Sequence, residues 1–337
     1  MPETKILNVQ PESIDPALIA QAVEVLKRGG LVAFPTETVY GLGADALSAQ
    51  AVESVFDAKG RPADNPLIVH ISSEKHLFDI VDEMPKVGEL LAKHFWPGPL
   101  TLVVKRTFLV PDNVAAHLDT VAVRMPNHPV ALALIEAFGG GIVAPSANLS
   151  GKPSPTTARH VMHDLRGKVD IILDAGPTPI GVESTVVDLS TDQPLVLRLG
   201  GLPVEQLRKV VSRLQTSTEI ESLMRSPGTR HRHYAPAAQV ILVEENDHDA
   251  YATAIQTHRQ QGKKVGAIVH SAALSNLERS EFVRALPNSS EVFAQRIYAL
   301  LREMDDVGVQ VIVVEGIEET GLGAAVMDRL RRAAQSS

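Results

Sequence analysis

Four cationic side chains lie where predicted helices and strands end, and together they could bind a single anionic ligand. Lys59 and Arg61 flank the glycine that ends a predicted helix, whereas Arg124 and Arg198 each close a predicted strand. Arginine offers a planar fork that matches phosphate or carboxylate, and lysine acts as a point charge. Any one of these cations, taken alone, is more often a solvated surface charge. Their shared position at the ends of elements favours an anion-binding site.

Hydroxyl and amide side chains gather in two further segments. The sequence PTET at 35–38 follows a short apolar run, and SANLSG at 146–151 follows another. Small polar side chains of this kind can hydrogen-bond a phosphate or a ribose and leave backbone N–H groups free to help. For SANLSG, composition alone favours a simple turn in which Asn and Ser bond their own backbone.

The elements that must position these residues begin with a buried strand over 31–34. Pro35 ends this strand, because proline has no N–H to give to a sheet. Gly41 and Gly43 then predict a glycine turn or a close approach of the backbone to a ligand. Ligand-binding residues of α/β sheets tend to lie at the carboxyl ends of strands, which is where the polar residues 36–38 fall. An ordinary strand followed by a glycine turn explains the composition as well.

Apolar periodicity predicts an α/β protein with a mixed sheet. Helices are predicted over 16–28, 48–60, 90–95, 129–138, 292–304 and 323–334, with Thr157 capping another. Strands are predicted over 67–71, 100–105, 120–125, 142–144, 171–173, 184–189, 195–199, 240–243, 265–269 and 309–314. Helices and strands alternate only in part, which indicates a mixed sheet instead of a purely parallel one.

Changes in this pattern predict two domains joined by a linker. Residues 1–211 form a larger α/β domain, 212–239 a linker, and 240–337 a smaller, Rossmann-like α/β domain. The smaller domain carries neither a GxGxxG nor a Walker A motif, so no nucleotide is assigned to it.

The bulk composition excludes several classes of protein. The chain has 337 residues, a net charge of −8 and no cysteine, which excludes disulfides, thiolate metal sites and a cysteine nucleophile. No apolar run could span a bilayer and no signal-peptide pattern is present, so we expect a cytoplasmic protein that does not bind membranes. The acidic balance argues against stable binding of nucleic acid.

Several motifs resemble one known family. PTETVYGLG at 35–43 and KGRPADNPLIVHI at 59–71 are similar to the YrdC-like threonylcarbamoyl-AMP synthases, and the likeness recurs at RMP, SANLSG, ESTVVD, LRLG and HYAP. The resemblance implies a YrdC-like twisted mixed sheet with flanking helices. The smaller domain resembles the extra C-terminal domain of the family's two-domain form.

The resemblance also implies a reaction. The expected enzyme is an adenylyltransferase, an L-threonylcarbamoyladenylate synthase, which makes threonylcarbamoyl-AMP and pyrophosphate from L-threonine, bicarbonate or CO₂, and ATP. Its product serves the threonylcarbamoyladenosine modification of tRNA next to the anticodon, so a downstream tRNA threonylcarbamoyl transferase complex is a candidate partner. Mg²⁺ is expected to arrive bound to the ATP phosphates, with no dedicated metal ligands on the protein.

Site residues carry over from the family motif by motif. The residues implied to bind L-threonine are Thr36, His70, Arg124, Ala144 and Ser184. The residues implied to bind ATP are Lys59, Arg61, Asn65, Thr120, Ser146, Asn148, Ser154, Arg198 and Tyr234. Lys59 and Arg61 are also the expected catalytic residues, because their charge can stabilise the departing pyrophosphate. For His70, a binding role is a safer prediction than a general-base role.

The linker departs from the family in its first half. It reads PGTRHRHYAP at 227–236, where the family usually has a pattern close to PGMxYxHYAP. The resemblance implies that this segment covers the nucleotide as a lid, with Tyr234 reaching the ATP. Composition alone favours a solvated tether.

Two other functions fit parts of this sequence less well. Hydrogenase-maturation carbamoyltransferases share the YrdC-like module but carry cysteine-rich zinc modules, which a chain without cysteine cannot form. An RNA-binding module would need basic and aromatic surface, and only 4% of the residues are aromatic. His160 and His163 share a predicted helix, but no third metal ligand is evident near them.

Overall fold

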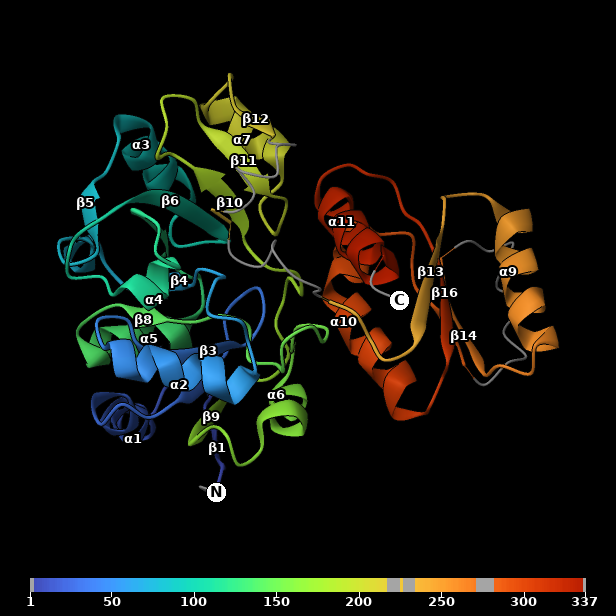
Figure 1. Cartoon of the computed structure of the whole chain (residues 1–337), viewed down its shortest axis with the longest axis horizontal. Helices are drawn as coiled ribbons and strands as arrows, with labels where there is room; N and C mark the ends of the chain where they lie inside the picture. Colours follow the sequence, from blue (N-terminus) through green and yellow to red (C-terminus); the bar gives the residue numbers. More distant parts are fainter. Residues whose placement is uncertain (1–2, 217–224, 227–233, 271–281, 336–337) are drawn as a thin grey trace. The chain divides into compact units, whose positions relative to one another are not determined.

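The computed structural model describes residues 3–216, 225–226, 234–270 and 282–335, and these residues form two compact units (Figure 1). The first unit comprises 1–150, 154–179 and 183–230, and the second comprises 151–153, 180–182 and 231–337. Two short segments that interrupt the first unit along the chain, 151–153 and 180–182, therefore belong to the second unit. Much of the predicted lid, at 217–224 and 227–233, lies outside the described residues, so the predicted domain boundaries stay predictions.

A large twisted sheet organises the first unit. In sheet order its described strands run β1-β9-β2-β3-β8-β4-β7-β6-β10-β11-β12, and β5 pairs with β6. The strands are β1 Lys5–Asn8, β2 Val32–Phe34, β3 Gly41–Asp45, β4 Ile68–His70, β5 Val81–Glu83, β6 Leu100–Arg106, β7 Thr120–Arg124, β8 Ile142–Val143, β9 Ile171–Asp174, β10 Thr185–Asp188, β11 Leu195–Arg198 and β12 Gln215–Thr216. Since β4 pairs parallel with β7 and β6 pairs antiparallel with it, the predicted mixed sheet is confirmed.

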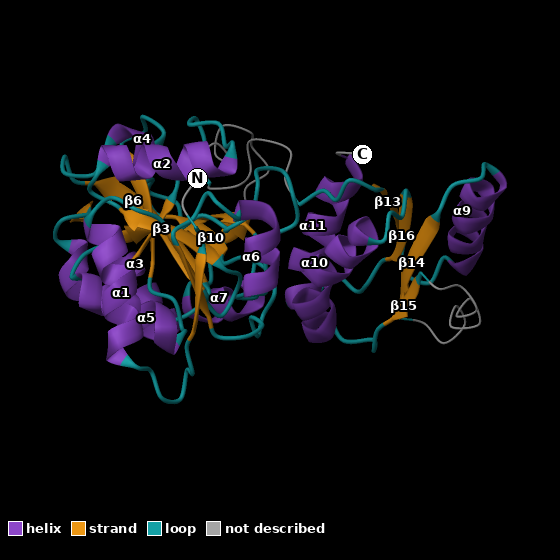
Figure 2. Ribbon diagram, turned by 90° about the horizontal axis from the view of Figure 1, so that it is seen from below, coloured by secondary structure: helices purple, strands orange, loops and turns teal. Residues whose placement is uncertain are grey.

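Helices flank this sheet (Figure 2). They are α1 Pro16–Lys27, α2 Ala49–Lys59, the 3₁₀ helix η1 Glu74–Leu77, α3 Lys86–Phe95, α4 Asp112–Ala115, α5 Pro129–Phe138, α6 Ala158–Leu165 and α7 Val204–Val210. The predicted caps of α2 are confirmed, because the Ser48 hydroxyl accepts from the N–H of Ala51 and Gly60 adopts a left-handed conformation. Thr157 caps α6 as expected.

The turn predicted at Gly41 and Gly43 was wrong, because both belong to β3, which pairs antiparallel with β2 in the register Phe34↔Gly41 and Val32↔Gly43. The alternative, a close approach of this backbone to a ligand, stays a prediction. A Cβ at Gly43 would lie 2.9 Å from the Phe34 ring, so glycine is needed there for side-chain packing across the strand pair.

The central strands of the sheet have two chemically different faces, because successive side chains of a strand point to opposite sides. One face carries the main hydrophobic core, which includes Val69, Val123, Leu102 and Val187. The other carries a small apolar cluster formed by Ile68, Val103, Ala122, Val186 and Leu197, and we call it the site face. Polar residues lie two positions along the chain from members of this cluster and share its side: His70, Thr101, Arg124 and Ser184.

The second unit is built on four parallel strands in the order β13-β16-β14-β15. These are β13 Gln239–Val243, β14 Val265–Val269, β15 Val283–Ala285 and β16 Val311–Glu315, with helices α9 His248–Gln260, α10 Ser290–Asp306 and α11 Leu322–Gln335. Figure 2 shows α10 and α11 on one face of this sheet and α9 on the other. Across the described residues of both units, no helix has the length and apolar content to cross a membrane.

Candidate active site

The predicted threonine-binding residues converge on the site face around Arg124. His70 and Arg124 are register partners at the ends of β4 and β7, so their side chains leave the sheet side by side. Ala144 joins them because its N–H donates to the carbonyl of Ile68, two residues before His70. The structure therefore brings together residues from three separate motifs of the sequence.

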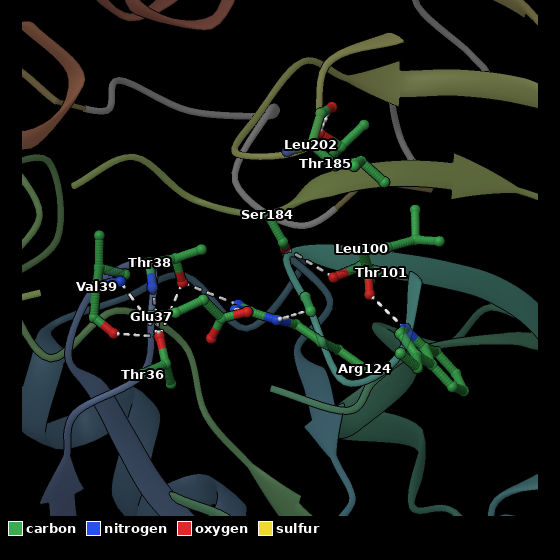
Figure 3. Close-up of polar contacts among 12 residues, drawn as sticks. Thr36, Glu37, Thr38, Val39, Leu100, Thr101, Arg124, Ser184, Thr185 and Leu202 are labelled. Carbon is green, nitrogen blue, oxygen red and sulfur yellow. Dashed lines mark hydrogen bonds and ion pairs between the residues drawn. The ribbon is translucent and has the colours of Figure 1, made fainter. Parts of the chain in front are cut away.

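Arg124 is held by the loop between β2 and β3 (Figure 3). Its Nη1 donates to the hydroxyl of Thr38 at 3.0 Å, its Nε donates to the carbonyl of Gly98 at 3.2 Å, and its Nη2 lies 2.7 Å from the carboxylate of Glu37. The side chains of Arg124 and Glu37 are only 4% and 6% exposed. The site thus contains a buried guanidinium with a counter-charge at its side.

Thr36 shapes this loop. Its hydroxyl donates to the carbonyl of Val39 at 2.7 Å and accepts from the N–H groups of Thr38 and Val39. Local bonding of a threonine hydroxyl to its own turn is a common way to fix a loop. Thr36 therefore supports the segment that carries Glu37 and Thr38 to Arg124.

Ser184 lies just before β10 on the same site face (Figure 3). Its hydroxyl shares a 2.7 Å hydrogen bond with Thr101 on β6. The Arg198 guanidinium donates to the Ser184 carbonyl at 2.9 Å and to its hydroxyl at 3.1 Å, so Arg198 fixes the Ser184 segment. Ser154, predicted to contact nucleotide, donates a 2.5 Å hydrogen bond to the carboxylate of Glu183.

Lys59 lies in an unexpected environment for a phosphate ligand, because the residue is only 2% exposed. Its ammonium donates to the carbonyls of Ser146 at 2.5 Å and Asn148 at 2.7 Å. The carbonyl of Lys59 also accepts from the N–H of Ser150. Lys59 therefore holds the SANLSG loop through both its side chain and its backbone, and a direct contact with phosphate stays a prediction.

Arg61 and Asn65 lie in one loop between α2 and β4. A terminal nitrogen of the half-buried Arg61 faces the carbonyls of Asn65 and Pro66 at 3.4 and 3.3 Å. Thr120 begins β7, whereas Arg124 ends it, so these two predicted ligands lie at opposite ends of one strand. Such a separation suits a site in which ATP and threonine occupy neighbouring but different positions.

Tyr234 belongs to the second unit. Its ring stacks on Tyr298 with centroids 5.8 Å apart, and the Arg329 guanidinium lies 4.8 Å above it. The adjacent Ala235 N–H donates to the carbonyl of Gly151 at 2.9 Å. Tyr234 is buried by these contacts, so its predicted reach to ATP stays a prediction.

His70 is neutral over the physiological pH range. Burial, and to a smaller extent the nearby positive charge of Arg124, lower its pKa to about 3, while the carbonyl of Ile68 acts in the opposite direction. A neutral imidazole can hydrogen-bond a substrate group without adding a charge to the site. The low pKa makes it a weak proton acceptor, in keeping with the predicted binding role.

This depressed pKa predicts a stability effect. In the unfolded chain His70 gains a proton as the pH falls below about 6.5, whereas in the folded protein it stays neutral down to about 3. Its contribution to stability is therefore complete above pH 6.5 and is lost as the pH falls toward 3. Between pH 7.5 and pH 5 we expect the unfolding free energy of wild type to fall by about 2 kcal/mol more than that of His70→Gln.

The measurement is urea unfolding of wild type and variant at several pH values, with His94→Gln at an exposed position as the control. Identical pH dependence in wild type and His70→Gln would show that His70 is not held in its neutral form.

Known proteins resemble this chain over nearly its whole length. Residues 24–200 match the Sua5, YciO and YrdC family model, described as "Telomere recombination", and residues 202–335 match the model "Threonylcarbamoyl-AMP synthase, C-terminal domain". The threonylcarbamoyl-AMP synthase of Pyrococcus abyssi is 48% identical over 98% of this chain and 97% of its own. The chain belongs to the threonylcarbamoyl-AMP synthase family. The family resemblance predicted from the motifs is thereby confirmed.

Other members of the threonylcarbamoyl-AMP synthase family show the same extent of similarity. The Bacillus subtilis threonylcarbamoyl-AMP synthase is 44% identical over 94% of this chain and 92% of its own. A crystal structure of Pyrococcus abyssi Sua5 complexed with L-threonine superposes with a TM-score of 0.93 at 47% identity, over 98% of each chain. Similarity of this extent covers both units of the fold.

Sequence reasoning missed three side chains that build the site of this family member. Glu37 and Thr38 lie within PTET but were assigned no role, and Thr101 was not singled out. For Glu37, the signal was a carboxylate between two apolar runs, which needs a partner once buried. For Thr101, it was a polar residue within the apolar run LTLVV at 100–104.

No three histidine, aspartate or glutamate side chains in the described ranges come together as a metal cluster. His160 and His163 stand in α6, where His160 contacts the N–H of Thr156 and His163 lies 3.0 Å from Asp164.

Proposed function

We propose that this chain makes threonylcarbamoyl-AMP and pyrophosphate from L-threonine, bicarbonate or CO₂, and ATP, in support of threonylcarbamoyladenosine modification of tRNA. The observation that carries the proposal is near full-length identity of 48% to a threonylcarbamoyl-AMP synthase, together with a buried Arg124 on an apolar site face. The relative with a TM-score of 0.93 was crystallised with L-threonine, which supports threonine as the amino acid.

In this proposal threonine binds on the site face. Arg124 binds the carboxylate, since a guanidinium in a buried site offers two parallel donors. Neutral His70, Thr36 and Ser184 surround the substrate with hydrogen-bonding groups, and Ala144 limits the space available to its side chain. Ile68 and Ala122 of the small cluster supply an apolar floor near the threonine methyl group.

ATP binds beside threonine through the other predicted residues. Arg61 contacts the triphosphate, and Lys59 acts at least in part by holding Ser146 and Asn148 in place. Further nucleotide contacts are assigned to Asn65, Thr120, Ser154, Arg198 and Tyr234. Mg²⁺ comes with the phosphates, since this ion keeps several waters and needs few protein ligands. When bound, it neutralises phosphate charge.

The reaction needs positioning more than covalent catalysis. The threonine nitrogen, as the neutral amine, attacks the carbon of bicarbonate, and water leaves with a proton from the nitrogen to give a carbamate. A carbamate oxygen then attacks the α-phosphorus of ATP, and pyrophosphate leaves with the bond electrons. Holding these groups in line replaces encounters in solution. Lys59 and Arg61 stabilise the negative charge that develops on pyrophosphate.

The product is a reactive mixed anhydride, so an acceptor must use it promptly. A downstream tRNA threonylcarbamoyl transferase complex fits this need as a partner. The second unit, which we take to be a Rossmann-like domain without its own nucleotide, would position the lid segment.

The proposal predicts that pyrophosphate release depends on two co-substrates at once. With ATP and Mg²⁺ present, release should require both L-threonine and bicarbonate, because the carbamate must form before adenylyl transfer. A coupled pyrophosphate assay and mass analysis of the nucleotide product would measure this in a buffer freed of CO₂. Equally fast release without bicarbonate would contradict the proposed reaction, as would its independence from threonine.

A further inference from the structure

Glu37 and Arg124 form a buried pair whose hydrogen-bonding capacity is not used up. Nη2 of Arg124 and Oε1 of Glu37 are 2.7 Å apart, so the opposite charges attract strongly. Yet neither of these atoms, nor Oε2 of Glu37, has a hydrogen-bond partner among the described residues. The two observations agree if the N–H bonds of Nη2 do not point toward the carboxylate.

Leaving buried polar atoms without hydrogen bonds costs free energy, because no water reaches them to form the missing bonds. Buried polar atoms in folded proteins nearly always have a partner, and an exception needs an explanation, such as a catalytic role or a bound ligand, ion or water. Here the exceptions are two acceptors on Glu37 and a donor nitrogen on Arg124, at adjacent positions. A complementary ligand must therefore present a donor and an acceptor close together, with a positive and a negative charge.

A free α-amino acid has this arrangement, because its ammonium and carboxylate groups are attached to one carbon atom. We propose that Glu37 binds the α-ammonium group of the substrate while Arg124 binds its α-carboxylate. The inference rests on the proposed function for the identity of the substrate. It assigns Glu37 as a second specificity-determining residue of the amino-acid site.

The neighbouring groups favour a cation at this position. His70, next to Arg124, is neutral because burial lowers its pKa to about 3. His128 also has a lowered pKa through burial, even though the charge of Glu37 acts to raise it. Among His70, His128 and Arg124, Arg124 is thus the positively charged neighbour of Glu37. The carboxylate of the ligand offsets the charge of Arg124.

Binding the ammonium group would do more than add affinity. Fixing the nitrogen beside Glu37 orients the atom that, once the ammonium has released one proton to solvent, is carboxylated in the first bond formed in the proposed reaction. It would also exclude hydroxy acids, in which a hydroxyl group replaces the ammonium and cannot supply a positive charge. Glu37 would therefore select substrates that carry the nucleophile the reaction needs.

A simpler role for Glu37 is to hold Arg124 in place without touching substrate. Calorimetric titration with two ligands separates the roles: L-threonine, and the 2,3-dihydroxybutanoate of matching stereochemistry, in which hydroxyl replaces the amine. With the full chain, we expect Glu37→Gln to weaken threonine binding about thirty- to a hundredfold and to change hydroxy-acid binding less than threefold. A role limited to Arg124 would weaken both ligands equally, because both carry the carboxylate.

Controls keep the outcome clear. Glu136→Gln makes the same chemical change at an exposed position of α5 and should leave both affinities unchanged. If Glu37→Gln folds poorly, Glu37→Asp serves as the second variant. It retains the negative charge, so it should keep part of the preference for threonine. Equal loss for both ligands in Glu37→Gln, or unchanged threonine affinity, would overturn the inference. Failure of the wild type to bind threonine would instead overturn the proposed function.

Discussion

Replacing Arg124 by alanine is expected to weaken L-threonine binding about thirtyfold to several thousandfold, with a much smaller change in the affinity for ATP. The guanidinium is buried, donates to Thr38 and Gly98, and retains donor capacity at Nη2. Removing one partner of a buried, hydrogen-bonded charge pair costs about 2 to 5 kcal/mol, which corresponds to this range. Calorimetric titration with each substrate measures both affinities.

The variant must be separated from simple loss of folding, because alanine at 124 leaves Glu37 buried without its counter-charge. Arg124→Lys keeps the charge but loses the planar fork, so it should fold better and still bind threonine weakly. Arg106→Ala is the matched control, since Arg106 contacts Asp112 and the carbonyls of Val110 and Leu118. A larger loss for ATP than for threonine would show that Arg124 has been assigned to the wrong substrate.

Replacing Lys59 by methionine is expected to reduce both stability and the use of ATP. Methionine fills much of the same space but leaves the carbonyls of Ser146 and Asn148 without the ammonium donor. A hydrogen bond from a charged donor contributes about 1.5 to 3 kcal/mol and two are lost, so we expect the unfolding free energy to fall by about 3 to 6 kcal/mol. That loss corresponds to a decrease in Tm of roughly 6 to 24 °C.

Arg61 provides the contrast, because it is half-buried and a terminal nitrogen of it faces carbonyls of its own loop. Arg61→Ala should raise the KM for ATP about ten- to a hundredfold while Tm changes by less than about 3 °C. Lys93→Met, at an exposed position of α3, controls for the loss of a lysine charge. If Lys59→Met melted at the wild-type temperature, the ammonium group would not be holding the SANLSG loop.

Much of the fold could be predicted from the sequence because its signals are local. The predicted strands over 120–125 and 195–199 appear as β7 and β11, and Ser48 and Gly60 bound α2 as their side chains suggest. Strand β3 was missed because Gly41 and Gly43 have low strand propensity, and pairing with β2 overrides that preference.

The grouping of site residues depends on contacts that local patterns do not encode. His70 and Arg124 meet because β4 and β7 pair in one register, although 54 positions separate them in the chain. Burial of Lys59 could not be read from its position beside a helix-ending glycine, since its acceptors come from residues 146 and 148. The family resemblance supplied the list of residues, but not how Glu37 and Arg124 bind each other.

The two-faced sheet has a consequence for how this sequence can change. A single-residue insertion inside β4 or β7 would turn every later side chain of that strand to the opposite face. An insertion in β7 before Val123 would direct Arg124 into the hydrophobic core and place Val123 at its former position on the site face. Such an insertion loses the substrate site and the fold together. Phe108 is 93% exposed in the surface loop after β6, and a residue added to this loop alters neither the substrate site nor the fold. Length variation among related chains should therefore accumulate in loops like this one and be absent from β4 and β7.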